Sequence, residues 1–227
     1  MQSVAKKLAA HDYQRINEAV AAAEAKTSAE IVPVVAAVSG RYDRPEDIVG
    51  LWAAAGSLAA TWALLPEHAG AGDWGSLPPW AYLLVLVFSM VVGFVVGAVV
   101  GAHVDWLRHL FTPAQQMRDE VFARSRQVFF DGRVHHTAGR TGLLIYVSLF
   151  ERMAAIVADE AVVAKLGQPA LDELRDHLTA SLRGQPLADA ICNTVAAAGR
   201  RLAAVLPRAE GDVNELPDAL VVLDRRL

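Results

Sequence analysis

The chain has 227 residues, of which 54% are hydrophobic and 20% charged, and its formal net charge is −4. With 21 basic and 25 acidic side chains it lacks the basic excess that nucleic acid binding requires. The single Cys192 excludes an internal disulfide and fits a reducing compartment. The hydrophobic share exceeds that of an average soluble domain and favours a membrane protein.

Residues 1–46 predict one helix and one strand of a soluble domain. Asp12 is expected to cap a helix that carries Ile16 and Val20 on one face. Residues 31–38 read as a strand, in which Pro33 suggests an edge position or a local irregularity. One helix and one strand cannot form a core alone, so this piece requires a second piece later in the chain.

Two apolar segments within residues 47–104 predict a transmembrane helical hairpin. The second, residues 80–104, contains no Asp, Glu, Lys or Arg. At ~1.5 Å per residue it exceeds the ~30 Å hydrocarbon core of a bilayer. The first, residues 48–65, is also uncharged and just long enough to span. A link rich in turn-forming residues, 66–79, joins the two spans.

Basic residues flank this hairpin and are absent from the link. They are Arg41 and Arg44 before it, and Arg108 and Arg118 after it. Because cytoplasmic flanks carry the positive charge, we expect both soluble pieces in the cytoplasm. The frequent Ala, Arg and Val residues suggest a bacterium, so the expected location is the bacterial inner membrane, with the protein multi-pass in the lipid bilayer.

Three glycines, Gly93, Gly97 and Gly101, repeat on one face of the second span. Small residues at this spacing let two helix backbones approach closely. This face can join two copies of the chain in a homo-oligomer, or it can pack the two spans of one hairpin together. The tether between the spans favours packing within the hairpin.

Residues 105–207 predict the second piece of the soluble domain. A helix that begins near residue 114 precedes two strands, residues 143–149 and 153–158. Their short connection makes the two strands antiparallel, and two amphipathic helices follow them.

The first strand and the 143–149 strand are joined through helices, which favours a parallel pair. In the C-terminal tail, residues 208–227, residues 220–223 can add a strand. The predicted fold class is α/β, with a small mixed sheet that is flanked by helices and interrupted by a transmembrane hairpin.

Three stretches resemble the TPM-domain family: INEAVAAAEAKTSAEIVPVV, RTGLLIYVSLFERMAAIVADEAV and NELPD, the last at residues 214–218. The likeness covers most of residues 11–218 apart from the hairpin. It is to a bacterial membrane-protein branch in which two transmembrane helices interrupt the domain. The resemblance implies an α/β fold, with acid phosphatase activity and calcium binding in some members. In others it implies accessory or repair roles on membrane protein complexes.

Charged residues stand at the ends of the predicted strands. Glu30 precedes the first, Arg140 precedes the second, and Asp159 and Glu160 follow the third. The predicted strand directions bring these ends to one edge of the sheet. Carboxylate oxygens are ligands that Ca²⁺ prefers, so Glu30, Asp159 and Glu160 are candidate metal ligands. The alternative is a set of solvated charges with a loose ion pair.

Other candidate positions carry weaker signals. The loop 39–43 follows a parallel strand, where α/β sheets often bind ligands. The adjacent pair His135 and His136 has no Cys or carboxylate at metal spacing, so we interpret both as loop residues.

Two functions compete on these observations. The first is a non-enzymatic membrane-anchored module that binds another membrane protein as an accessory factor. The alternative is a metal-dependent acid phosphatase with an acidic, calcium-binding edge, which follows from the family resemblance.

Overall fold

The computed structural model describes residues 4, 7–42, 44–65, 78–209, 211, 214–217 and 219–224. Most of the predicted link, residues 66–77, and the positions Asp43 and Asp218 lie outside the described residues. The chain forms two compact units. Residues 1–40 and 114–227 make up one, which we call the α/β unit, and residues 41–113 make up the other, the helical unit.

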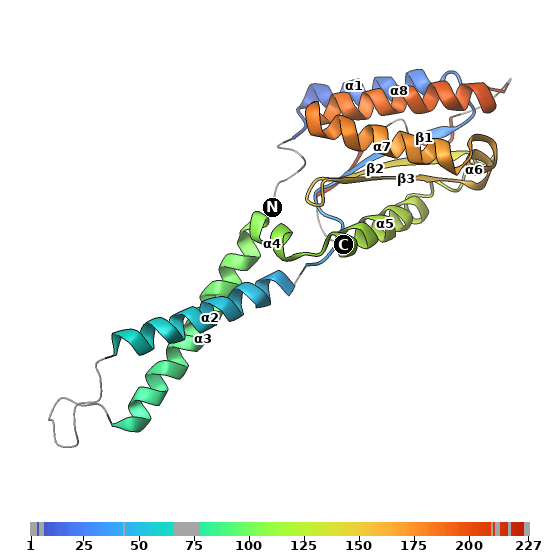
Figure 1. Ribbon diagram of the computed structural model, residues 1–227. Coiled ribbons are helices and arrows are strands. Elements are labelled where there is room, and N and C mark those ends of the chain that lie inside the picture. The colour runs from blue at the N-terminus through green and yellow to red at the C-terminus, as the bar shows by residue number, and fades with distance from the viewer. Residues whose placement is uncertain are drawn as a thin grey trace. The chain divides into compact units, whose positions relative to one another are not determined.

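A four-stranded mixed sheet with the order β3-β2-β1-β4 is the centre of the α/β unit (Figure 1). The strands are β1 (Glu30–Ala36), β2 (Gly142–Ser148), β3 (Met153–Ala158) and β4 (Val221–Leu223). β1 pairs in parallel with β2 and with β4, whereas β2 and β3 are antiparallel. The predicted fold class and both predicted strand pairings are confirmed.

Helices cover both faces of this sheet (Figure 1). One face carries α1 (Ala10–Glu24), α7 (Gln168–Gly184) and α8 (Leu187–Val205), and the other carries α5 (Ala114–Asp131). The short α6 (Glu160–Leu166) lies between β3 and α7 in the sequence.

Side chains alternate between the two faces along each strand, as strand geometry requires. Ile31 and Val35 of β1 belong to the core under α1, α7 and α8, whereas Val32 and Val34 pack with residues of α5. Both faces of β1 and β2 are therefore buried, which explains why these strands read as nearly continuous apolar runs.

The predicted N-cap of the first helix is wrong. α1 begins at Ala10, and Asp12 lies inside its first turn, where its Oδ2 accepts the backbone N–H of Ala9 at 2.9 Å. Pro33 lies in β1, which has β2 on one side and β4 on the other. The pairing of β1 with β4 starts only at Val34, so among the described strands Pro33 pairs with β2 alone and its other side is open, as an edge position requires. The strand expected in the tail is β4, which joins the sheet of its own chain.

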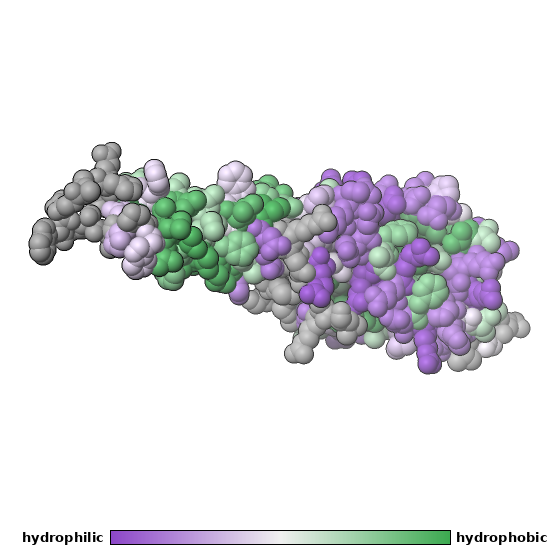
Figure 2. Space-filling model, turned by 90° about the horizontal axis from the view of Figure 1, so that it is seen from below, coloured by the Kyte–Doolittle hydropathy of each residue, from purple (hydrophilic) through white to green (hydrophobic). Residues whose placement is uncertain are grey.

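The helical unit contains α2 (Arg44–Leu64), α3 (Pro79–His103) and the short α4 (Asp105–Phe111). Within α2 and α3, the stretches Glu46–Leu64 and Trp80–His103 are long and apolar enough to cross a membrane. Only 11% and 6% of their most apolar windows are buried in the structure, so neither is the core helix of a soluble fold. Figure 2 shows the resulting apolar surface over these helices.

α2 and α3 pack on each other at the predicted glycines. A Cβ on Gly93 would lie 2.8 Å from the carbonyl oxygen of Ala53, and one on Gly97 would lie 2.8 Å from that of Val49. The hydroxyl of Ser57 also donates to the carbonyl oxygen of Ser89 at 2.9 Å. The close approach that Gly93 and Gly97 allow is thus made within the hairpin.

Candidate functional site

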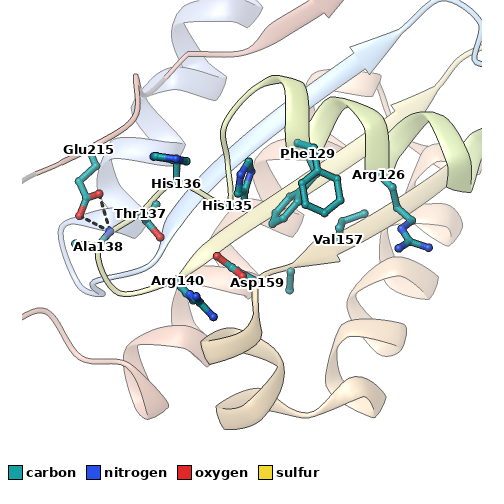
Figure 3. Close-up of a pocket in the computed structure, with 12 residues that line it drawn as sticks. Arg126, Phe129, His135, His136, Thr137, Ala138, Arg140, Val157, Asp159 and Glu215 are labelled. Carbon is teal, nitrogen blue, oxygen red and sulfur yellow. Dashed lines mark hydrogen bonds between the residues drawn. The ribbon is translucent and has the colours of Figure 1, made fainter.

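A cleft of about 810 Å³ opens in the α/β unit beside α5 and the end of β3 (Figure 3). We call it the α5–β3 cleft. Its lining residues are Arg126, Phe129, Phe130, His135, His136, Thr137, Ala138, Arg140, Val157, Ala158, Asp159 and Glu215. Its volume is within the range of small-molecule sites, about 300–1,000 Å³.

The segment between α5 and β2 forms one wall of the cleft and is fixed by short contacts. A Cβ on Gly142 would collide with the carbonyl oxygen of Val134, so only glycine at the start of β2 lets this segment lie so close. The backbone N–H of Thr141 donates to the Thr137 hydroxyl at 2.8 Å. The N–H of Ala138 donates to the Glu215 carboxylate at 2.9 and 3.2 Å.

Four rings stand together along this wall. The ring centroids of Phe130 and His135 are 5.1 Å apart, and those of His135 and His136 are 5.4 Å apart in an edge-on arrangement. Phe129, which is buried, lies 5.8 Å from Phe130 and nearly perpendicular to it. These separations are typical of favourable aromatic contacts, so the wall is aromatic and well packed.

Two buried polar atoms in the cleft have no hydrogen-bond partner among the described residues: Nδ1 of His135 and Oδ2 of Asp159. The other oxygen of Asp159 accepts the backbone N–H of Glu160 at 2.8 Å and caps α6. A buried polar atom without a partner costs ~1–3 kcal/mol, and most native proteins avoid that cost. A ligand in the cleft can therefore supply the hydrogen-bond partners that these two atoms lack.

The two arginines of the cleft, Arg140 and Arg126, differ in their contacts with other residues. Arg140 adopts a φ of 51°, a left-handed backbone conformation that is uncommon outside glycine. Its guanidinium pairs with Glu160 at 2.8 Å, with the two side chains 67% and 76% exposed. Arg126, on the exposed side of α5, makes no hydrogen bond or ion pair with another described residue.

The predicted metal ligands share one edge of the sheet but not one point in space. Glu30 pairs with Gly142 in the β1–β2 register, and the N–H of Asp159 donates to the carbonyl oxygen of Gly142 at 2.9 Å. Glu30, however, is only 8% exposed, and its Oε1 accepts the N–H of Glu215 at 3.0 Å. Among the described residues, no three His, Cys, Asp or Glu side chains are grouped so that they could hold a metal ion. The geometry gives the predicted calcium site no support, and it stays a prediction.

The opposite end of β1 is closed by a buried hydrogen-bond network. Glu151, 2% exposed, accepts the backbone N–H groups of Ser39 at 2.9 Å and Gly40 at 3.2 Å, and also the hydroxyl of Ser148. The Ser39 hydroxyl contacts that of Tyr146 at 2.9 Å. Burial raises the pKa of Tyr146 to about 12. These polar groups bind one another, so the network fixes the start of the 39–43 loop.

Comparisons with known proteins give a likeness of fold. No family model and no curated protein matches the chain. One solved structure is similar: the NMR structure of the BA42 protein from the psychrophilic bacterium Bizionia argentinensis. The sequences are 16% identical, the alignment covers 98% of this chain and 99% of that one, and the TM-score is 0.56.

Proposed function

We propose that the protein is a membrane-anchored, TPM-like module whose α/β unit binds another membrane protein as a non-enzymatic accessory factor. The observation that carries this proposal is the outer surface of α5. Phe122 and Phe130 are 55% and 54% exposed. With Val221 they are the large apolar side chains that are exposed in the described part of the α/β unit.

The two phenylalanines lie on one side of α5, with Arg126 between them at helical spacing. Aromatic and arginine side chains are enriched at the energetic centres of protein interfaces. Figure 2 looks onto the α5 side of this unit and shows apolar areas among polar ones. The mixture is typical of an interface that forms from a water-soluble surface.

The pairing of β1 with β2 supports the prediction of two membrane spans. β1 precedes the helical unit and β2 follows it, yet the two strands pair along their length, from Glu30 with Gly142 to Ala36 with Ser148. Paired strands must be on the same side of a membrane. If α3 crosses the bilayer, α2 must cross it as well, because one span alone would separate β1 from β2. This requirement supports a multi-pass anchor although α2 is the less apolar helix.

The positive flanks of the hairpin support a cytoplasmic α/β unit at a bacterial inner membrane. No observation on the described residues favours the alternative metal-dependent phosphatase, because they include no group of metal ligands.

Purification from native membranes tests the partner-binding proposal. Phe122→Ala should lose a membrane protein that copurifies with the unchanged chain, because a truncated aromatic anchor often costs ~2 kcal/mol or more of binding free energy. The control is His177→Ala, a substitution of an exposed residue on α7, on the opposite side of the sheet. Equal recovery of every copurifying membrane protein with both variants would refute the role of this surface.

A further inference from the structure

We propose that the α5–β3 cleft binds a small aromatic acid that carries a ring hydroxyl or amino group. The inference concerns the cleft and goes beyond the proposed partner-binding function. The two surfaces share Arg126 and Phe130, whereas Phe122 lies outside the cleft lining.

The ring-shaped part of the ligand follows from the wall of the cleft. Phe130 and His135 form an aromatic pair with ring centroids 5.1 Å apart, and Phe130, which lines the open cleft, is 54% exposed. Figure 3 shows the ring of His135 on the wall of the cleft, above Asp159. A flat ring can stack on this wall in the offset or edge-on geometries that aromatic groups prefer.

The hydroxyl or amino group follows from Asp159 and His135. A carboxylate oxygen accepts hydrogen bonds, so Oδ2 of Asp159, buried without a partner, requires a donor from the ligand. Nδ1 of His135 is also buried without a partner, and it donates or accepts according to its tautomer. A hydroxyl or amino group meets the need of Asp159. A hydroxyl that donates its one proton to Asp159 can still accept from a protonated Nδ1 of His135, whereas an amino group has a second N–H for an unprotonated Nδ1.

The acidic group follows from Arg126. Its guanidinium lines the cleft, and no described carboxylate pairs with it, whereas Arg140 is engaged with Glu160. Figure 3 shows Arg126 on the far side of Phe129 from Asp159. A ligand that reaches both residues therefore carries its donor at one end and its anion at the other. Arginine binds carboxylates with two parallel hydrogen bonds, which suits an organic acid.

Two further polar groups of the wall are already engaged within the protein. The Thr137 hydroxyl accepts the N–H of Thr141, and the Glu215 carboxylate accepts the N–H of Ala138. The cleft thus offers the Asp159 acceptor, the imidazoles of His135 and His136 and the Arg126 cation around an aromatic wall. This set matches a hydroxylated or aminated aromatic acid and does not match an uncharged hydrocarbon.

Calorimetric titration of the full chain in lipid nanodiscs tests the proposal, with empty nanodiscs as the background. The probes are two matched pairs: 4-hydroxycinnamate with cinnamate, and 4-aminobenzoate with benzoate. At least one substituted acid should bind, and its unsubstituted partner should bind about tenfold more weakly, the effect of one hydrogen bond.

Variants assign the effect to residues. Asp159→Asn keeps a good helix cap but removes the acceptor, so it should abolish the tenfold preference for the substituted acid. His135→Phe keeps the ring and should reduce the preference for a hydroxylated acid. Arg126→Gln should weaken both members of a pair equally. Arg118→Gln, on the same helix outside the cleft lining, is the control and should change nothing.

Three results would overturn the proposal: no probe binds above the background, both members of each pair bind equally, or Asp159→Asn keeps the preference. Phe122→Ala should leave acid binding unchanged, so failure of the partner interaction and failure of the ligand site are separable.

Discussion

Glu151→Ala should destabilise the α/β unit more than any change of an exposed charge. The carboxylate is 2% exposed and accepts two backbone N–H groups, from Ser39 and Gly40, besides the hydroxyl of Ser148. Alanine removes the carboxylate that accepts these three hydrogen bonds. The hydroxyl can rotate toward its neighbours, but the two N–H groups have fixed directions and lose their partner.

The expected cost follows from these two donors. A buried donor without an acceptor costs ~1–3 kcal/mol, so the pair predicts a loss of about 4 kcal/mol in the free energy of unfolding. That is a large part of the ~5–15 kcal/mol that stabilises a typical domain. Glu151→Gln keeps one neutral oxygen in nearly the same place. It should cost only ~1–2 kcal/mol, because hydrogen bonds to neutral acceptors are weaker than those to charged ones.

Hydrogen exchange measured by mass spectrometry is the suitable assay, on the full chain in nanodiscs. All five tryptophans lie between residues 52 and 106, in the helical unit, so their fluorescence does not report on the sheet. The opening free energy of peptides from β1 and β2 should fall by the amounts given. Glu160→Ala, which removes an exposed ion pair, is the control and should cost at most ~0.5 kcal/mol. A Glu151→Ala loss no larger than this control would refute the reasoning.

Three further outcomes are expected. Because the pKa of Tyr146 is raised from 10.0 to about 12, unfolding releases a proton in this window. The stability of the chain should therefore fall by ~2–3 kcal/mol as pH rises from about 10 to about 12, and Tyr146→Phe should lack that slope in urea titrations at each pH. Gly97→Leu should lower the tryptophan-monitored melting temperature of the helical unit, whereas Gly56→Leu should not, because a Cβ on Gly56 meets nothing within 4 Å. In a cysteine-free background, an impermeant thiol reagent applied to intact cells should label Ser76→Cys and spare Ala180→Cys; the reverse would overturn the orientation.

The sheet was largely predictable because connection length constrains strand direction. Phe150, Glu151 and Arg152 cannot cross over between parallel strands, so β2 and β3 had to be antiparallel. The long excursion between β1 and β2 equally favoured a parallel pair. The short helices α4 and α6 were not predicted, because seven residues carry too little periodicity to stand out from a loop.

The cleft was not predictable, because it is a product of tertiary contacts. Its lining comes from α5 and the following segment, from the end of β3, and from Glu215 near the C-terminus. His135 and His136 were interpreted as loop residues on sequence spacing alone. Their placement beside Phe129 and Phe130 depends on how closely the backbone at Val134 can approach β2, and Gly142 was the single local signal of that approach.

The carboxylates at the edge of the sheet show which features strand register determines and which it does not. Register fixes backbone neighbours, so the proximity of Glu30 and Asp159 to Gly142 followed from the predicted strand directions. A metal site also requires side chains that converge, and their directions depend on competing partners. Glu30 is engaged by a backbone N–H 185 residues away in sequence, and one oxygen of Asp159 caps α6. Because Asp159 lines the α5–β3 cleft and its other oxygen has no hydrogen-bond partner among the described residues, the same residue is better suited to receive a donor from an organic ligand than to complete a calcium site.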